Sequence, residues 1–149
     1  MNQKEAAEAL SSISRTKARF AAGFEEIPFV RHALFGLTYA ILIGSATLET
    51  SASFIGVAAA LALVFLQIRQ DRSRYGVFVN GYRRGKTLPL SITLVIVMVG
   101  FILAAIHAAD ADWPDLWKAG LTFAGFAIAT GASMIWQRIY IAELREDAR

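Results

Sequence analysis

The sequence of 149 residues contains no cysteine, and four long stretches of it contain no Asp, Glu, Lys or Arg. The absence of cysteine excludes disulfide bonds, thiolate catalysis and cysteine metal sites. The neutral stretches comprise residues 32–48, 50–68, 87–109 and 119–137. Pumps and proton relays depend on charged side chains inside the membrane, so the usual signs of an ion pathway are missing.

Each neutral stretch has about the length that a helix needs to cross the ~30 Å hydrocarbon core of a bilayer. The composition agrees, because 56% of the residues are hydrophobic and 18% are charged, whereas soluble domains carry about 25% charged residues. We therefore predict an all-α fold, a bundle of four transmembrane helices within residues 28–140. The predicted spans are about 31–48, 51–69, 88–109 and 114–138.

The charges are divided unequally between the two sides of these spans. Every Lys and Arg except Lys118 lies before the first span, between the second and third spans, or after the fourth. The opposite side carries Lys118, Glu49, Asp110, Asp112 and Asp115. Basic residues concentrate in cytoplasmic segments. The sequence therefore predicts a protein of the bacterial cytoplasmic membrane with both termini, the 70–87 loop and the 141–149 tail in the cytoplasm.

The two connections on the acidic side are predicted to be short. The first two spans almost touch, so the chain must reverse direction between residues 47 and 53. In the other connection Asp112, Pro114 and Asp115 match an N-cap, an early-turn proline and an acid at the third helical position. This pattern predicts that the fourth span is capped by Asp112.

Small residues recur at every fourth position along each span. The hydrophobic effect contributes little to association between helices in lipid, so close packing of small residues must supply it. The residues predicted to form these helix-packing faces are Gly36, Ala40, Gly44, Gly56, Ala60, Gly100, Gly125 and Ala129. They either pack the four helices of one chain together or form a seam with a second copy or a companion membrane subunit.

The N-terminal segment, residues 1–27, is predicted to form a cytoplasmic amphipathic helix. Apolar residues recur in steps of four and three along positions 6–27, which is typical of such a helix. Phe20 and Phe24 lie in the apolar stripe, and the stem of Lys17 can follow the stripe while its ammonium reaches lipid phosphates. A helix lying on the inner leaflet is the simplest account, and a coiled coil with the same spacing is the alternative.

The loop between the second and third spans holds six bases and one acid over residues 69–87. Each basic residue near an anionic leaflet gains about 1 kcal/mol, so the loop is predicted to bind anionic phospholipids. The alternative is that these charges only determine the topology. The loop residues predicted to contact lipid or a protein partner are Arg72, Arg74, Arg83, Arg84 and Lys86.

Catalytic and cofactor patterns are weak. His32 and His107 lie at opposite ends of the predicted membrane region, so one chain cannot offer both to a single haem. His107, Asp110 and Asp112 could bind a cation, but such a cluster is more often a solvated acidic loop. The serines have no histidine and carboxylate evidently placed at the same depth. We expect no enzyme activity, no cofactor and no nucleic-acid partner.

Two functions from different classes fit these observations. The first is a non-enzymatic module that oligomerises in the membrane and engages anionic lipid or a partner through the amphipathic helix and the basic loop. The alternative is a small transporter or pore for a neutral or apolar solute. Its lining would consist of Thr38, Tyr39, Ser45, Gln67, Thr93, Thr122 and Thr130.

Overall fold

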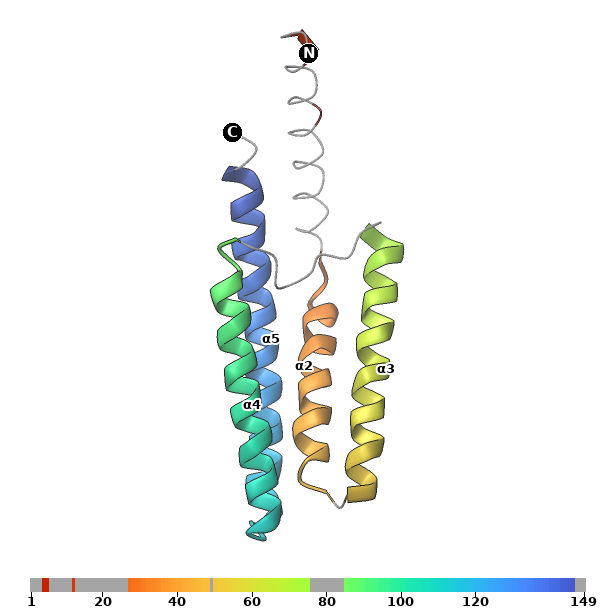
Figure 1. Cartoon of the computed structure of the whole chain (residues 1–149), viewed down its shortest axis with the longest axis vertical. Helices are drawn as coiled ribbons and strands as arrows, with labels where there is room; N and C mark the ends of the chain where they lie inside the picture. The colour runs from red at the N-terminus through yellow and green to blue at the C-terminus, as the bar shows by residue number, and fades with distance from the viewer. Residues whose placement is uncertain (1–3, 6–11, 13–26, 49, 76–84, 147–149) are drawn as a thin grey trace.

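In the residues that it describes, the computed structural model has four helices (Figure 1). It describes residues 4–5, 12, 27–48, 50–75 and 85–146. The helices are α2 (Phe29–Ser45), α3 (Thr50–Tyr75), α4 (Leu88–Asp110) and α5 (Asp115–Glu146). Within these described ranges there is no strand, which confirms the prediction of an all-α fold. Most of the predicted amphipathic helix lies outside the described residues.

Three of the four described helices have the length of membrane spans, and the bundle has an apolar surface. Helices α3, α4 and α5 are long and apolar enough to cross a membrane. Helix α2 is also apolar but has only 17 residues, which gives a length of roughly 25 Å. Large apolar side chains such as Phe54, Ile55 and Leu116 are exposed along the bundle. Soluble monomers rarely expose contiguous apolar surface of this extent, whereas lipid chains cover it without cost.

Helix α2 starts after Pro28, whose extended backbone (ψ 149°) cannot continue a helix in the N-terminal direction. At its other end the Ala46 amide donates to the Leu42 carbonyl. The Thr47 amide and hydroxyl both donate to the Gly44 carbonyl, over 3.2 and 2.7 Å. These bonds satisfy carbonyls that the helix end would leave unpaired. The chain can therefore reverse within a few residues and enter α3 at Thr50.

The connection from α4 to α5 differs from the prediction that Asp112 caps the fourth span. Asp112 has a φ of 51°, and its amide donates to the Ala109 carbonyl while the Trp113 amide donates to the Ala108 carbonyl. This is the bond pattern that closes a helix C-terminus with a left-handed residue. Asp112 therefore ends α4, and Asp115 is the first residue of α5. The N-cap prediction was wrong because aspartate also tolerates the left-handed conformation.

Helix α2 occupies the centre of the bundle. It packs most closely against α5 and then against α3, whereas α4 packs mainly against α5 (Figure 1). The main buried cluster joins α2, α4 and α5 through Ile43, Met98, Ala105 and Ala129. Helix α3 contributes nothing to this cluster. It is attached to the rest of the bundle along α2 alone, apart from weaker contacts.

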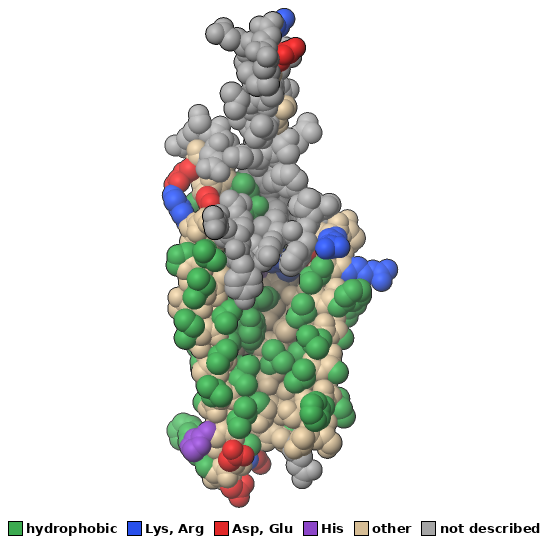
Figure 2. Space-filling view, viewed as in Figure 1, with side chains coloured by type: hydrophobic (Ala, Val, Ile, Leu, Met, Phe, Trp, Pro, Cys, Tyr) green, Lys and Arg blue, Asp and Glu red, His purple; other side chains and the backbone are tan. Residues whose placement is uncertain are grey.

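Charged side chains lie at the two ends of the bundle, above and below an uncharged middle (Figure 2). We call one end the basic end, defined by Arg31, Arg69, Arg72, Lys86, Arg138 and Arg145. The other is the acidic end, defined by Asp110, Asp112 and Asp115. A second buried cluster, Ile27, Tyr140 and Leu144, lies at the basic end and joins the residues before α2 to the last turns of α5.

Candidate functional site

An ion pair joins α2 to α3 at the basic end. The guanidinium of Arg31 donates two hydrogen bonds to the carboxylate of Asp71, from Nε to Oδ1 over 2.9 Å and from Nη2 to Oδ2 over 2.7 Å. The Asp71 side chain is 11% exposed and that of Arg31 is 30% exposed. A two-pronged contact of this kind fixes geometry as well as adding energy. It therefore holds the first turn of α2 against the last turns of α3.

One helical turn away, Gln67 makes a second polar contact between the same two helices. Its Nε2 donates to Thr38 Oγ1 over 3.0 Å and to the Leu34 carbonyl over 3.3 Å. Gln67 and Asp71 are four positions apart, so they lie on one face of α3. The face of α3 that meets α2 at the basic end is thus polar, although the helix is otherwise apolar.

A histidine joins α2 to α5. The side chain of His32 is buried, with Nδ1 2.9 Å from Ser133 Oγ and Nε2 2.7 Å from Gln137 Oε1. The amide oxygen of Gln137 can only accept, so Nε2 carries the hydrogen and Nδ1 accepts from the Ser133 hydroxyl. The neutral imidazole is therefore fully hydrogen-bonded. Ser133 and Gln137 are again four positions apart on one helix face.

The contact between Ser133 and His32 has the geometry of a nucleophile and its base. Gln137, however, carries no charge to stabilise an imidazolium, which a triad carboxylate does. Neither of the two cavities described next reaches this pair. The contact joins α2 to α5.

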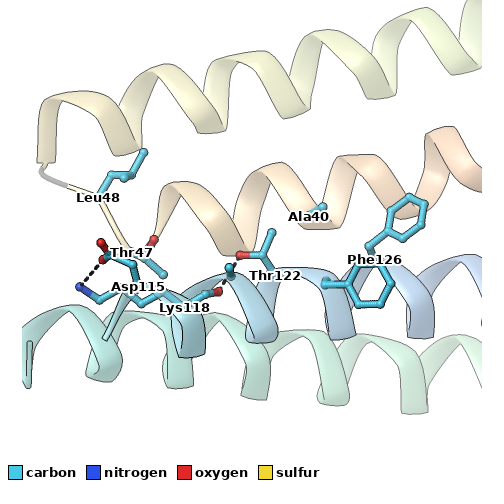
Figure 3. Close-up of a pocket in the computed structure, with 9 residues that line it drawn as sticks. Ala40, Thr47, Leu48, Asp115, Lys118, Thr122 and Phe126 are labelled. Carbon is cyan, nitrogen blue, oxygen red and sulfur yellow. Dashed lines mark hydrogen bonds and ion pairs between the residues drawn. The ribbon is translucent and has the colours of Figure 1, made fainter. Parts of the chain in front are cut away.

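A groove of about 460 Å³ lies between α2 and α5 at the acidic end (Figure 3). Its lining residues are Ala40, Thr47, Leu48, Asp115, Lys118, Ala119, Thr122, Phe123 and Phe126. Lys118 and Asp115 form an ion pair at 3.9 Å within it. A second hollow of about 270 Å³ lies between α3, α4 and the turn that follows α2, and Phe54, Ile106 and Asp110 are among its lining residues.

The glycines of α2 lie where α5 approaches most closely. A side chain at Gly36 would place its Cβ 2.1 Å from Thr130 Oγ1 and 2.7 Å from the Phe126 carbonyl oxygen. A Cβ at Gly44 would lie 3.4 Å from the Thr122 methyl group, an ordinary contact. Only glycine therefore fits at position 36 without moving the two helices apart.

The other predicted packing residues are divided among different surroundings. A Cβ at Gly125 would lie 2.2 Å from Ile43 of α2, and one at Gly56 of α3 would lie 2.1 Å from Ser45. A Cβ at Gly100 would meet nothing within 4 Å. Ala60 and Ala129 are buried, and Ala40 lines the groove. Gly100 is thus the predicted packing residue that faces open space.

The predicted lipid-binding residues are described only in part. Arg72 is exposed on α3. Lys86 is also exposed, and its ammonium contacts the carboxylate of Glu146 on α5. This contact ties the end of the basic loop to the last turn of α5. The predicted residues whose side chains lie outside the described part of the chain are Lys17, Phe20, Phe24, Arg74, Arg83 and Arg84.

The structure does not bring the proposed transport lining together. Thr38 and Gln67 bond to each other between α2 and α3, and Ser45 donates to the Leu42 carbonyl of its own helix. Thr130 is buried against Gly36, while Thr93 is exposed on α4. Tyr39 packs beside the main buried cluster, and Thr122 lines the groove. Most of these side chains are used in contacts within or between helices.

The predicted cation cluster takes no metal-binding form in the described part of the chain. The His107 ring lies edge-on to Trp113, with 6.1 Å between the ring centroids. Among the described residues no group of three or more His, Asp or Glu side chains could hold a metal ion. Asp110 and Asp112 are both exposed.

Sequence reasoning missed the polar contacts of the basic end. The sequence pattern indicates only that Arg31 and Asp71 flank the predicted spans. A further signal was present, because Gln67 and Asp71 are one helical turn apart and therefore lie on one face of a helix. His32 could have been identified as one member of a network only with the position of α5 in hand. Comparisons with protein-family models, with curated proteins and with solved structures found no match to the chain.

Proposed function

We propose that the protein is a non-enzymatic interaction module of the bacterial cytoplasmic membrane, with its basic end in the cytoplasm. The observation that supports this most directly is the separation of charge between the two ends of an apolar bundle (Figure 2). Arg69, Arg72 and Arg138 are exposed at the basic end. Exposed bases beside a membrane-spanning bundle attract anionic headgroups and follow the cytoplasmic bias of basic residues.

In this proposal the basic loop and the N-terminal segment engage anionic phospholipids or an acidic protein partner. The contact between Lys86 and Glu146 supports a loop held at the basic end, close to the lipid surface. The polar contacts of Arg31 and His32 hold α2 between α3 and α5, so the bundle acts as a rigid support for these segments. No covalent chemistry is required of it.

The test is lipid retention measured by native mass spectrometry of the full chain in mild detergent. Replacing Arg83 and Arg84 by Ala should lower the retention of phosphatidylglycerol severalfold, since each base near an anionic surface contributes about 1 kcal/mol. The matched control is Lys at both positions, which keeps the charge and should keep the lipid. Replacing Phe20 and Phe24 by Glu tests the N-terminal segment. Unchanged lipid and partner retention in both variants would remove the basis of the proposal.

We also propose that the chain self-associates through α4. Gly100 supports this, because its missing side chain is met by nothing within 4 Å in the single chain. A small residue left open on a membrane helix lets a second helix approach closely. The same native spectra should show a dimer that Gly100→Leu converts to a monomer. A monomer in the unaltered protein would rule out this part of the proposal.

A further inference from the structure

The groove at the acidic end combines an apolar wall with a charged mouth (Figure 3). Ala40, Phe123 and Phe126 line the apolar part, and Asp115 and Lys118 stand at the first turn of α5. Along α5 the distance from Asp115 to Phe126 is roughly 16 Å at 1.5 Å per residue. This is about half of a ~30 Å hydrocarbon core. The groove therefore extends over about the depth of one leaflet, starting at the headgroups.

The two charges at the mouth are only loosely paired. Lys118 Nζ lies 3.9 Å from Asp115 Oδ1, which is longer than a hydrogen bond. The Lys118 side chain is 17% exposed, whereas that of Asp115 is fully exposed. The stem of Lys118 thus packs within the groove and its ammonium can reach the mouth. Both charges retain hydrogen-bonding capacity for a ligand.

The hydroxyl groups beside them are available as acceptors. Thr47 donates its hydroxyl hydrogen to the Gly44 carbonyl over 2.7 Å. Thr122 donates its hydrogen to the Lys118 carbonyl over 3.0 Å. A hydroxyl oxygen that has used its hydrogen can still accept. The groove therefore offers one cationic donor together with a carboxylate and two hydroxyl acceptors.

We propose that this groove binds a membrane phospholipid whose headgroup carries both a phosphate and a primary ammonium. The phosphate contacts Lys118, the ammonium donates to Asp115, and an acyl chain lies against Phe123 and Phe126. The volume of about 460 Å³ lies within the range of small-molecule sites, about 300–1,000 Å³. The site is at the end of the bundle opposite the basic loop, so it goes beyond the proposed function.

Charge complementarity selects this headgroup over other phospholipids. A quaternary ammonium has no N–H to donate, so phosphatidylcholine cannot hydrogen-bond to Asp115. Phosphatidylglycerol carries a net negative charge and no ammonium group. It would bind at the acidic end of the bundle, which already carries Asp110, Asp112 and Asp115. Like charges in proximity oppose binding. Phosphatidylethanolamine alone among the three matches both charges of the mouth.

The test uses the full chain in mild detergent, titrated with these three lipids carrying identical acyl chains and read by native mass spectrometry. Phosphatidylethanolamine should be retained roughly fivefold more than phosphatidylcholine, as expected for one added charge-assisted hydrogen bond. Asp115→Ala removes the acceptor, so it should abolish this preference and leave phosphatidylcholine retention unchanged. Lys118→Gln should lower the retention of both lipids.

Two further variants separate the site from general effects. Asp112→Asn removes an exposed carboxylate of the same end that does not line the groove, and it should leave the preference for phosphatidylethanolamine over phosphatidylcholine intact. Ala119→Phe fills the groove without changing its charge and should lower the retention of phosphatidylethanolamine and phosphatidylcholine. Equal retention of these two lipids by the unaltered protein, or an ethanolamine preference that survives Asp115→Ala, would each overturn the proposal.

Discussion

Helix α2 meets its two main neighbours in different ways. Against α5 it packs through glycines, with Gly36 beside Thr130 and Phe126, and Gly125 beside Ile43. Against α3 the described polar contacts are the Arg31–Asp71 ion pair and the bonds of Gln67. In the most apolar stretches of α3 and α5, 6% and 22% of the residues, respectively, are buried inside the chain. Helix α3 therefore has less packed surface than α5, and polar contacts with α2 make up a larger part of its attachment.

This difference indicates how each interface should respond to mutation. Two helices packed together in lipid are held by many dispersion contacts, each of them small. An added atom that pushes the helices apart weakens all of these contacts at once. A polar attachment fails when one partner is removed, because the remaining group is left unpaired. The α2–α5 interface should therefore be sensitive to added volume, and the α2–α3 interface to lost charge.

The largest effect is expected from Gly36→Ala. The new Cβ would lie 2.7 Å from the Phe126 carbonyl oxygen, a backbone atom that cannot rotate away. We expect a loss of about 2–3 kcal/mol in the free energy of unfolding, the scale of overpacking in a core. The measurement is unfolding in mixed micelles with increasing SDS. The control is Gly131→Ala, which meets nothing within 4 Å and should gain up to about 1 kcal/mol in helix stability.

The second effect is expected from Asp71→Asn, which leaves Arg31 without its counter-charge. We expect a loss of about 1–2 kcal/mol, because Asp71 is buried while the 30% exposed Arg31 can be partly compensated by water. The change should be confined to α3. Since the chain has no cysteine, spin labels at Val30→Cys and Leu66→Cys can report the α2–α3 distance directly. The distance distribution should broaden.

The charge exchange Arg31→Asp with Asp71→Arg is the matched rescue for this second prediction. It keeps one charge of each sign at the interface and should narrow the distance distribution again. An unchanged distribution in Asp71→Asn would show that packing, rather than the ion pair, holds α3 in place.

The smallest effect is expected from Gln67→Leu. It removes the bonds to Thr38 and the Leu34 carbonyl, and hydrogen bonds between membrane helices contribute about 0.6 kcal/mol on average. The loss should be near that value in the same SDS titration. Gln70→Leu, an exposed position on the same helix, should leave the unfolding free energy unchanged. A loss above about 2 kcal/mol would mean that α3 depends on Gln67 more than on Asp71.

Much of the fold could be predicted from the sequence because a bilayer requires long neutral helices. The positions of the helices follow from the runs between charged residues. The Arg31–Asp71 pair was missed for the same reason, since a span defined by neutrality stops before Asp71. The structure continues α3 to Tyr75. Charged residues just beyond a neutral run can thus lie on the same helix and face a partner.

The packing residues and the groove could be predicted less well. Glycine and alanine recur at the same spacing on every helix. This spacing predicts that another helix can approach closely, but it does not indicate which helix. Gly36 of α2 meets α5, Gly56 of α3 meets α2, and Gly100 of α4 meets neither. The groove forms where small Ala40 faces Phe126 across two helices, an arrangement that depends on the rotation of α5 about its axis. No local pattern contains that information.

The Arg31–Asp71 pair lies between the two segments that hold the predicted lipid-binding residues. Arg31 follows the N-terminal segment closely, and Asp71 lies near the start of the basic segment 69–87. Binding energies at linked positions are reciprocal. If a ligand on the loop favours the closed pair, the closed pair must strengthen binding on the loop by the same factor. If a ligand on the N-terminal segment favours the closed pair as well, each ligand strengthens the binding of the other. The N-terminal segment and the basic loop, which are far apart in the chain, would then bind their ligands cooperatively. Breaking the Arg31–Asp71 ion pair would make the two binding events independent.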